Sequence, residues 1–395
     1  MRILHVVTAW KRDPEDVITP WLVALAEKQA ERGHEVDVLA PSWRGIRGQA
    51  SDGHSVHRFR YAPARWERLT HEETVPDRLQ RHPAYAALVP GYLVAGVTAA
   101  WRLGRERGPD VVHVHWAVPH GVAGWVAARA AGSATLVTTF YGAEIRWAEK
   151  RFPPARAFLR WYCRRSRLVA ISESTRAMMA PYAGDRPIEV IPYGVPLPDA
   201  GTGAPAERAD PPRILFVGRL VARKGVDRLL EGLARLTDRP WRLEIVGFGP
   251  ERDPLERRAA ALGLTDRVEF LGRVSGDALV SAYRRAACFV LPATLDERQD
   301  TEGLGVVLLE AMSYAVPVVA TRRGGIVDIV EDGRTGLLVE DDPAALARGI
   351  ASILDDAHGS RALGEAGRVS VRERFGWDSI VDRLEAVYRS RPESP

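Results

Sequence analysis

The sequence predicts an α/β protein built from two doubly wound domains, each with a parallel sheet covered by helices. The chain has 395 residues, which is more than one ordinary hydrophobic core supports. Two segments, 2–7 and 213–218, open alike, because each is a short β-rich run followed by a helical pattern and a second apolar run. Strands that alternate with helices form parallel sheets through crossover connections. Two such starts therefore indicate two doubly wound domains.

The expected strands follow one another through both halves of the chain. In the first half they are 2–7, 35–40, 110–114, 135–139, 167–171 and 187–191, and in the second half 213–218, 242–246, 267–271, 287–291, 316–320 and 336–339. The stretch 196–212 is rich in Pro, Gly, Ala and charge, which is typical of a linker between domains. We therefore expect an N-terminal domain over 1–195, this linker, a C-terminal domain over 213–375 and a final amphipathic segment over 376–395.

The composition is that of a soluble globular protein. Hydrophobic residues make up 46% and charged residues 27%, and the formal net charge is +4. The two cysteines, Cys163 and Cys288, lie in apolar contexts, which favours reduced thiols in a cytosolic protein. Residues 2–7 read as a strand, too short for the apolar core of a signal peptide. We therefore expect a cytoplasmic location.

Two segments raise the question of membrane contact. Residues 84–101 carry no charge over 18 positions, but Pro90 and Gly91 interrupt them, so a buried crossover helix is favoured over a membrane span. Residues 146–167 hold eight basic side chains among five aromatic ones, which favours a solvated helix face with an aromatic core side. Docking on anionic lipid at the inner face of a membrane, or on a phosphate-bearing acceptor, is the alternative for this segment. Nucleic acid is not expected, because no recognised module accompanies the segment.

The most informative pattern lies at 300–325. It places Glu302 and Glu310 eight positions apart, which is about 12 Å along a helix. Between them, Gly303-Leu304-Gly305 runs into an apolar helix; glycines let backbone N–H groups approach an anion, and a helix start adds partial positive charge. Two carboxylates at this separation can hold hydroxyls at both ends of one long ligand that has phosphates between them. A nucleotide sugar has this form.

The order of motifs around these carboxylates carries a resemblance to a known family. Glu302 and Glu310 are followed by Pro317-Val318-Val319-Ala320-Thr321 and Gly324-Gly325, and the segments 216–225, 244–250, 268–272 and 332–339 fit the same pattern. This order resembles the retaining family-4 glycosyltransferases of GT-B fold, in which two Rossmann-like domains face each other across a cleft. The resemblance covers essentially the whole chain and is strongest over 213–340.

The resemblance implies the roles of the donor-side residues. Arg219 and Lys224 would stabilise the leaving diphosphate, Glu302 would contact the donor sugar, and Glu310 would take the ribose hydroxyls. Backbone groups near Arg273 would read the base, with a UDP-sugar favoured and a GDP-sugar next. The complete donor-binding set is Gly218, Arg219, Lys224, Gly247, Gly249, Arg273, Val274, Glu302, Gly303, Leu304, Gly305 and Glu310.

We expect no metal ion and no cofactor besides the nucleotide-sugar co-substrate. Fixed cations and a helix N-terminus can replace a metal at a diphosphate, and no Asp-x-Asp lies at a suitable strand end. Lys224 is the only lysine after residue 200, in a chain whose other basic residues there are all arginine. A lysine is a compact point charge that suits a pyrophosphate. The implied reaction is retaining sugar transfer in the interdomain cleft, onto a hydroxyl of a polysaccharide, a glycolipid or a small metabolite.

The acceptor side belongs to the first domain, where the match to the family is looser. His115 and His120 fall at or just beyond a strand end, where α/β sheets bind ligands, although structural histidines fit as well. Tyr141 stands where the family usually has a histidine; it can donate a hydrogen bond but, with a pKa near ~10, cannot act like imidazole at pH 7. Tyr193 replaces a usual asparagine. Lys11-Arg12 lies where many members have a glycine pair, and these cations could replace it electrostatically or meet an acceptor phosphate.

Other interpretations remain open at this point. A sugar-nucleotide epimerase of GT-B fold would turn over the donor alone, and a non-catalytic partner of another transferase would bind the donor without turnover. Single residues have structural alternatives too. Glu302 could cap a helix start, and Arg219 and Lys224 could pair with Asp227 or Glu231 in the following helix.

Overall fold

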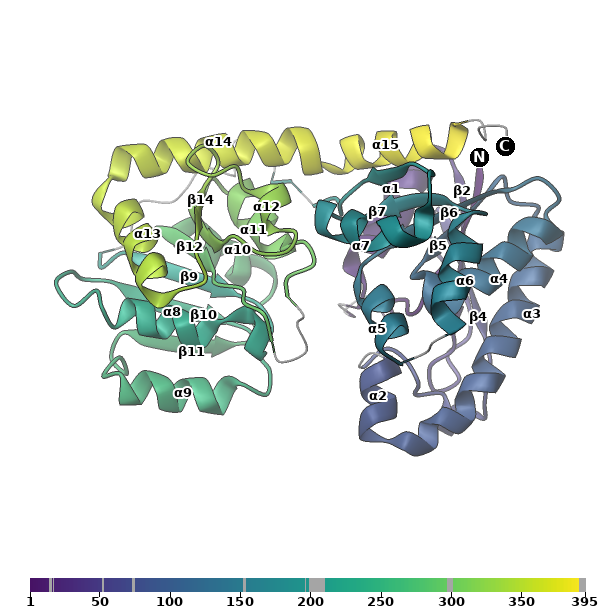
Figure 1. The fold of residues 1–395 in the computed structure, drawn as a ribbon, viewed down its shortest axis with the longest axis horizontal. Helices are drawn as coiled ribbons and strands as arrows, with labels where there is room; N and C mark the ends of the chain where they lie inside the picture. The colour runs from purple at the N-terminus through teal and green to yellow at the C-terminus, as the bar shows by residue number, and fades with distance from the viewer. Residues whose placement is uncertain are drawn as a thin grey trace. The chain divides into compact units, whose positions relative to one another are not determined.

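The computed structural model describes residues 1–13, 16, 18–51, 53–72, 75–151, 154–195, 197–198, 210–296 and 301–390. The chain forms two compact units (Figure 1). Unit 1 consists of Met1–Gly194 together with Trp377–Pro395, and unit 2 consists of Val195–Gly376. Most of the predicted linker, 196–212, lies outside the described residues.

Unit 1 is built on an eight-stranded sheet in the order β3-β4-β2-β1-β5-β6-β7-β8. Only β3 runs antiparallel to its neighbour, and the other pairs are parallel. The strands are β1 (Arg2–Val6), β2 (Glu35–Pro41), β3 (Gln49–Ser51), β4 (His54–Phe59), β5 (Val111–His115), β6 (Thr135–Phe140), β7 (Arg167–Ala170) and β8 (Ile188–Val190). The helices are α1 (Pro20–Glu31), α2 (Val75–Arg81), α3 (Val89–Arg107), α4 (Ala117–Ala130), α5 (Ala143–Arg151), α6 (Pro154–Cys163), α7 (Glu173–Ala183) and α15 (Trp377–Arg389), with the 3-10 turns η1 (Ala64–Trp66) and η2 (Pro83–Leu88).

Both faces of this sheet are covered. Because side chains alternate along a strand, Leu4 and Val114 enter a core with α3, α4 and α6. Ile3 and Val111 point to the opposite face, where they pack with α15. The C-terminal helix is therefore part of the core of unit 1 and not an appendage.

Unit 2 is built on a six-stranded parallel sheet in the order β11-β10-β9-β12-β13-β14. Its strands are β9 (Arg213–Val217), β10 (Arg242–Val246), β11 (Val268–Gly272), β12 (Cys288–Leu291), β13 (Val318–Thr321) and β14 (Leu337–Val339). Its helices are α8 (Val226–Leu233), α9 (Arg252–Ala261), α10 (Gly276–Arg285), α11 (Val306–Ser313), α12 (Ile326–Ile329), α13 (Pro343–Asp355) and α14 (Ala357–Phe375), with the 3-10 turn η3 (Ala222–Lys224).

The predicted strands are confirmed, with ends that differ by at most two residues. The edge strands β3 and β4 were not predicted. His54–Phe59 contains two histidines, a serine and an arginine, so its apolar signal is weak, and it becomes a strand by pairing along β2. The two cysteines are buried free thiols, as expected.

The prediction that 84–101 forms a crossover helix is confirmed, but the prediction that this helix is buried is wrong. The segment forms η2 and the first part of α3, a crossover between β4 and β5, but Val94 is 66% exposed and Trp101 is 47% exposed. Pro83–Arg107 is long and apolar enough to cross a membrane by length and composition alone, a test that helices of soluble proteins also pass. One face of α3 packs on the core through Tyr92, Gly96 and Ala100, and its opposite face is open.

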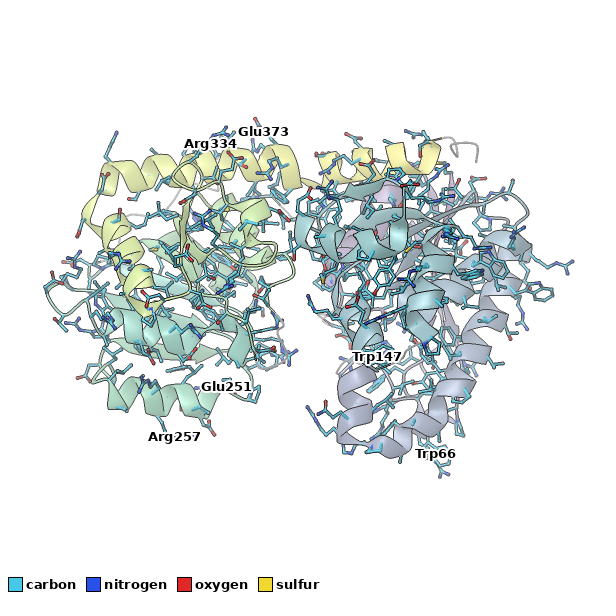
Figure 2. The ribbon with its side chains drawn as sticks, in the orientation of Figure 1. Trp66, Trp147, Glu251, Arg257, Arg334 and Glu373 are labelled. Atoms are coloured by element: carbon cyan, nitrogen blue, oxygen red, sulfur yellow. The ribbon has the colours of Figure 1, made fainter. Side chains whose placement is uncertain are left out.

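The basic segment 146–167 has the geometry of a solvated helix face with an aromatic core side. Tyr162 is fully buried in α6, and its hydroxyl hydrogen-bonds Thr138 Oγ1 at 2.7 Å. Arg160 and Arg165 lie on the exposed face and stack over neighbouring aromatic rings. Neither this geometry nor any likeness to known proteins supports membrane contact by the segment. In other parts of the molecule large apolar side chains do reach solvent; Trp66, for instance, points away from the ribbon of unit 1 (Figure 2).

Candidate functional site

The donor-side residues lie at the carboxyl ends of the strands of unit 2. From β9 the chain proceeds outward to β10 and β11, and then returns to the other side of β9 to form β12. Parallel sheets bind ligands at such a reversal, because the loops after the two adjacent strands separate there. Lys224 follows β9, and Glu302 follows β12. The topology therefore brings these two predicted residues together at the one reversal point of the sheet.

Lys224 and Glu302 form a buried ion pair. The Lys224 ammonium donates to Glu302 Oε2, and Arg223 Nη1 lies 3.7 Å from the same oxygen. Burial on its own would raise the pKa of Glu302, but the charges of Lys224 and Arg223, with hydrogen bonds from Lys224 and the Gly303 N–H, lower it below the usual range. The structural alternatives for Lys224 are therefore wrong, because its partner is Glu302, and Glu231 pairs with Arg258 instead.

Glu302 is not a helix cap either. Helix α11 begins after Gly305, whose φ of 95° requires a residue that tolerates the left-handed region, and no side chain caps the first turn. The carboxylate of Glu302 is engaged by cations and not by helix amides. Gly303, Leu304 and Gly305 form the loop between this carboxylate and α11, as the sequence predicted.

Glu310 is a partly buried carboxyl with no cation beside it among the described residues. Tyr283 donates a hydrogen bond of 2.7 Å to Glu310 Oε2, and among the described residues Glu310 makes no ion pair. Burial raises its pKa, and the Tyr283 hydroxyl only partly offsets this. A buried carboxyl costs free energy unless its acceptor capacity is used. The second oxygen of Glu310 is therefore suited to a hydroxyl donor from a ligand.

Glycines allow the loops after β9, β10 and β13 to approach closely. A Cβ on Gly247 would lie 1.8 Å from the carbonyl oxygen of Gly218, and one on Gly249 would lie 2.1 Å from that of Leu220. Likewise a Cβ on Gly324 would lie 2.0 Å from the carbonyl oxygen of Glu302. No other residue fits these contacts, so the glycines of the motifs are needed for the backbone of the site itself.

The exposed side of this site carries a cation–aromatic pair that sequence reasoning missed. The Arg273 guanidinium, after β11, lies 4.2 Å from the centroid of the Phe248 ring, after β10, and Phe248 is 47% exposed. Arg219 is also exposed, and its side chain makes no hydrogen bond or ion pair with any described residue. The available signal was a large apolar side chain between two glycines, Gly247 and Gly249, just beyond the end of a strand.

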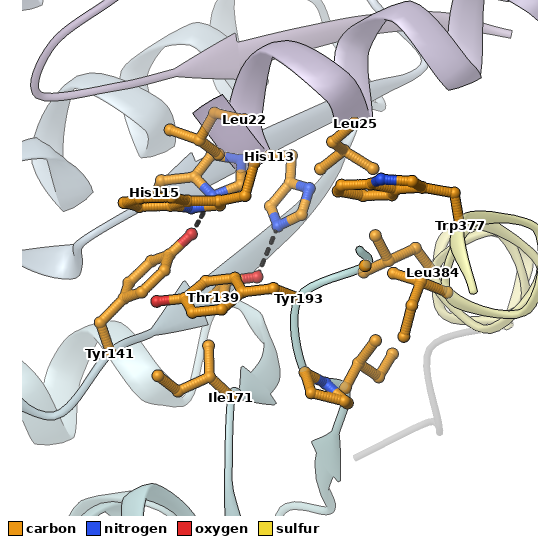
Figure 3. Close-up of a pocket in the computed structure, with 15 residues that line it drawn as sticks. Leu22, Leu25, His113, His115, Thr139, Tyr141, Ile171, Tyr193, Trp377 and Leu384 are labelled. Atoms are coloured by element: carbon orange, nitrogen blue, oxygen red, sulfur yellow. Dashed lines mark hydrogen bonds between the residues drawn. The ribbon is translucent and has the colours of Figure 1, made fainter. Parts of the chain in front are cut away.

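In unit 1, the fold brings His115 and Tyr141 together in a buried chain of hydrogen bonds. Tyr141 OH lies 2.7 Å from His115 Nδ1, and His115 Nε2 lies 3.0 Å from His5 Nδ1. His5 Nε2 lies 2.7 Å from Gln29 Oε1, and Gln29 Nε2 donates to the Tyr388 hydroxyl at 3.0 Å. The chain thus runs from the end of β6, through β5, β1 and α1, to the C-terminal helix α15 (Figure 3 shows its first part).

The chain continues through a third histidine. His113 Nδ1 lies 2.8 Å from the Tyr388 hydroxyl, and His113 Nε2 lies 2.8 Å from Thr139 Oγ1. The lower dashed bond of Figure 3 is this contact between His113 and Thr139. Burial lowers the pKa of His5 to about 4 and holds the pKa values of His113 and His115 well below the usual range. All three rings are therefore neutral at physiological pH.

Neutral rings fix the direction of every bond in the chain. The amide oxygen of Gln29 can only accept, so His5 Nε2 carries its proton and His5 Nδ1 accepts from His115 Nε2. His115 Nδ1 must then accept from the Tyr141 hydroxyl. Tyr141 has therefore already used its proton, and it offers a ligand only an acceptor oxygen. The hydrogen bond that Tyr141 was expected to be able to donate therefore goes to His115.

Two of the residues that depart from the family pattern, Tyr141 and Tyr193, belong to one aromatic cluster. The rings of Tyr141 and Tyr193 stack with centroids 5.7 Å apart, and Trp116 stacks on Tyr141 at 4.2 Å. Trp21 contacts Tyr193 at 5.0 Å. The adjoining pocket (Figure 3) has a volume of about 30 Å³, enough for about one water molecule and too small for a sugar. Tyr141 and Tyr193 thus replace the family residues together, as one packed surface.

His120 and the first-loop cations lie apart from this cluster. His120 lines a different pocket, between α3 and α4, where its Nε2 lies 3.3 Å from Tyr92 OH, and burial lowers its pKa to about 4. Lys11 pairs with Glu27 at 3.3 Å, and Arg12 binds Asp16 through two nitrogens. The two cations thus have carboxylate partners of their own.

The three histidines are also the only described group whose spacing could hold a metal ion. Ligand atoms of His5, His113 and His115 lie within 4.8 Å of one another. However, every ring nitrogen already has a hydrogen-bond partner within the chain described above. The hydrogen-bond network accounts for the histidines without a metal. Sequence spacing could not reveal the group, because His5 lies 110 residues from His115.

Glu144 is a further buried acid at this end of unit 1. Its Oε1 accepts the Tyr141 backbone N–H at 2.8 Å, while its Oε2 is buried with no hydrogen-bond partner. Burial raises the pKa of Glu144 to about 7. Glu144 holds the backbone of Tyr141 in place and therefore belongs to the support of the candidate site.

Comparison with known proteins identifies the family. The family model described as Glycosyltransferase Family 4 matches residues 21–198, and the model described as Glycosyl transferases group 1 matches residues 203–370. The chain is 32% identical over 381 residues, 92% of each chain, to a protein of Mycolicibacterium smegmatis. That relative is named GDP-mannose-dependent alpha-(1-6)-phosphatidylinositol monomannoside mannosyltransferase. The chain belongs to the family-4 glycosyltransferases.

Other relatives and structures agree on family and fold. The chain is 32% identical over 401 residues to a D-inositol 3-phosphate glycosyltransferase of Acidothermus cellulolyticus, covering 93% of this chain and 84% of the relative. Sucrose-phosphate synthase from Thermosynechococcus elongatus superposes with a TM-score of 0.77 at 23% identity, covering 98% of both chains. Anabaena HepE in complex with UDP superposes with a TM-score of 0.70 at 20% identity over 98% of both chains. The predicted GT-B class, with two Rossmann-like domains, is confirmed, and the protein is a glycosyltransferase by family.

Proposed function

We propose that the protein moves a sugar from a nucleotide diphosphate sugar to a hydroxyl acceptor, with retention of configuration and without a metal ion. The observation that carries the proposal is the buried pair of Lys224 and Glu302 at the reversal point of the unit 2 sheet, beside the cation-free Glu310. A diphosphate would take over Lys224 and leave Glu302 free to accept hydroxyls of the donor sugar. Glu310 would accept the ribose hydroxyls.

The leaving diphosphate would be stabilised by positive charge that the chain itself supplies. Lys224 is buried, and Arg219 is exposed without a partner among the described residues. The Gly303 to Gly305 amides at the start of α11 add donors. Because the donor phosphate can take the proton of the acceptor hydroxyl as it departs, no protein nucleophile is required. Electrostatic groups of this kind contribute roughly 10²–10³ in rate each.

We propose a GDP-sugar, and GDP-mannose in particular, as the donor, in preference to the UDP-sugar that the resemblance favoured. The Mycolicibacterium relative is named for GDP-mannose. The exposed Phe248 ring offers a stacking surface to a guanine or a uracil base, and the Arg273 guanidinium adds attraction to an aromatic ring. For the acceptor we propose an inositol-containing molecule, because inositol occurs in the names of both relatives described above.

Calorimetric titration with GDP-mannose, UDP-glucose, ADP-glucose and dTDP-glucose tests the donor site. We expect one donor class to bind, and Lys224→Ala to weaken it at least tenfold, since a fixed cation at the diphosphate is lost. Arg239→Ala is the matched control, because Arg239 lies in the loop before the amino end of β10, where it pairs with Asp238 and with Asp355 of α13. Equal donor affinities of the wild type and Lys224→Ala would show that the donor does not bind at this position.

Turnover separates transfer from the other functions. With the bound donor and an inositol phosphate acceptor we expect a glycosidic product whose anomeric configuration, read by proton NMR, equals that of the donor. A new sugar nucleotide formed without acceptor would indicate an epimerase. Tight donor binding with neither product nor hydrolysis across acceptors would indicate a binding partner of another transferase.

A further inference from the structure

The pocket that lies between α3 and α4 of unit 1 is not used by the site described above. Its volume is about 330 Å³, about twice that of an engineered apolar cavity that takes up benzene. It is lined by aromatic and aliphatic side chains, among them Phe59, Tyr92, Val94, Val97 and Val122, with His120 as its main polar group. A pocket with this lining has few donors or acceptors to offer a sugar or a phosphate. It favours a hydrocarbon ligand.

The packing of the two helices explains where the pocket lies. Small residues let α3 and α4 approach closely at one end, where a Cβ on Gly104 would lie only 2.4 Å from the carbonyl oxygen of Ala127. The pocket lies toward the other end, between Tyr92 to Thr98 of α3 and Pro119 to Ala123 of α4. In Figure 1 these two helices run side by side at the edge of unit 1.

The pocket opens at the edge of the sheet where ligands bind. Phe59 is the last residue of β4, and the lining part of α4 directly follows the end of β5 at His115. Both belong to the carboxyl edge of the unit 1 sheet, the edge at which α/β folds bind their ligands. The pocket is therefore on the side of unit 1 expected to receive the acceptor.

The mouth of the pocket is exposed and apolar. Leu93, Val94 and Val122 are 40%, 66% and 39% exposed, and the 18 positions 84–101 contain no charge. Charge returns directly after this stretch with Arg102 and Arg105, and the Arg105 guanidinium stacks over the exposed Trp101 ring. The uncharged stretch around the mouth therefore favours contact with hydrocarbon.

From this geometry we infer that the α3–α4 pocket binds one aliphatic chain of a lipid-linked acceptor. A hollow of this size favours an inserted chain over a flat protein partner, which would leave the hollow empty and forfeit dispersion contacts. The acceptor role of the chain rests on the proposed function, whereas the binding of the chain itself is independent of any turnover. The preferred acceptor is thus a lipid-linked inositol, which should have a lower KM than a free inositol phosphate.

Alkyl maltosides of eight, ten and twelve carbons, titrated into the full chain below their micelle concentrations, test the pocket. We expect affinity to rise roughly fourfold for each methylene buried. Val94→Asp places a charge at the mouth, and Val97→Trp fills the pocket, so each should weaken the dodecyl probe at least tenfold. Val369→Asp is the matched control, because Val369 is 44% exposed on α14 of unit 2. The inference would be overturned if the affinity did not depend on the length of the alkyl chain, or if it stayed unchanged in both pocket variants.

Two further readouts separate the possible occupants. With lysophosphatidylinositol and inositol 3-phosphate as acceptors, Val94→Asp should raise KM for the lipid. It should leave both KM for inositol 3-phosphate and the affinity for GDP unchanged. If the variants weaken the alkyl probe but leave KM for the lipid unchanged, the chain is not that of the acceptor and the inference fails. If sedimentation shows that Val94→Asp only dissociates a dimer, the face is a contact between two copies and the inference fails as well. If the wild type does not bind GDP, that result would count against the proposed function and not against the binding of an aliphatic chain in the pocket.

Discussion

At the scale of single residues, Glu144 is an acid held in its neutral form by its surroundings. Its side chain is buried, one oxygen accepts the Tyr141 N–H, and the other has no partner. With a folded-state pKa of about 7, the folded protein binds a proton between about pH 4.5 and 7 that the unfolded chain releases. Stability from this residue is therefore fully present below pH 4.5 and is lost as the pH rises through 7.

Replacement of Glu144 by glutamine tests this account. The amide keeps an acceptor for the Tyr141 N–H and does not titrate. The free energy of unfolding of Glu144→Gln, relative to that of the wild type, should therefore increase by up to about 3 kcal/mol between pH 5 and pH 8. Urea unfolding at the two pH values measures the difference, in which the contributions of the buried histidines cancel. The exposed Glu106 of α3 provides the control, Glu106→Gln, which should show no such change. A pH-independent difference for Glu144→Gln would contradict the raised pKa.

Gly247 shows how one residue limits the backbone of the donor site. Gly247→Ala should abolish GDP binding or unfold unit 2, because its Cβ would overlap the carbonyl oxygen of Gly218, at 1.8 Å. Gly263 also has a positive φ, 71° against 145° at Gly247, but there is open space around its Cβ, so Gly263→Ala should cost only about 1 kcal/mol. Thermal unfolding with and without GDP compares the two. Similar effects of both variants would show that backbone conformation, not close approach, requires glycine at 247.

At the scale of secondary structure elements, unit 1 depends on a directed hydrogen-bond chain between helices and strands. Gln29 of α1 is its central link, because it accepts from His5 of β1 and donates to Tyr388 of α15. The same tautomer follows for all three histidines, with the proton on Nε2. The network ties the acceptor oxygen of Tyr141 to the position of the C-terminal helix.

Breaking the central link should affect stability and tautomers together. Gln29→Leu leaves the His5 Nε2–H without a partner and removes the Gln29 donor from the Tyr388 hydroxyl, which keeps only His113; this should cost about 2 kcal/mol or more. Long-range ¹⁵N–¹H NMR of the wild type should show Nε2–H tautomers for His5, His113 and His115 that do not titrate between pH 6 and 8, and changed His5 shifts in the variant. Gln80→Leu, on an exposed residue, is the control. A His5 that titrates near pH 6.5 in the wild type would refute the neutral network.

The elements also explain what the sequence could and could not predict. The family resemblance placed Lys224 and Glu302 at one donor site, and the fold brings them together because each follows a parallel strand of the same sheet. Their direct ion pair was not predicted, since helix neighbours of Lys224 were considered as its partners. Gln29 and Tyr388 are 359 residues apart and lie inside amphipathic helices, where a polar side chain normally faces solvent. Nothing in their local pattern marks them as buried, so the network could only come from the three-dimensional fold.

At the scale of the whole molecule, the chain passes between the two units twice, and each unit has a separate core. Unit 1 is completed only by Trp377–Pro395, so residues from both ends of the chain must come together to form it. Unit 2 is a continuous stretch whose ends are linked, because the Val195 N–H donates to the carbonyl oxygen of Phe375 at 3.0 Å. Unit 2 can thus form from one continuous segment, and unit 1 cannot.

This division predicts how ligands change thermal unfolding. GDP at about a hundred times its Kd stabilises the unit that binds it by about 2.7 kcal/mol, which for a unit of this size raises its Tm by roughly 5–10 °C. Calorimetry should therefore show two transitions, of which GDP shifts only that of unit 2, and Lys224→Ala should remove the shift. Removal of α15 by a stop codon at Trp377 should abolish the unit 1 transition and keep the GDP-sensitive one, because α15 supplies Ile380, Val381 and Leu384 to the unit 1 core. A single transition that GDP shifts as a whole would show that the two units unfold as one.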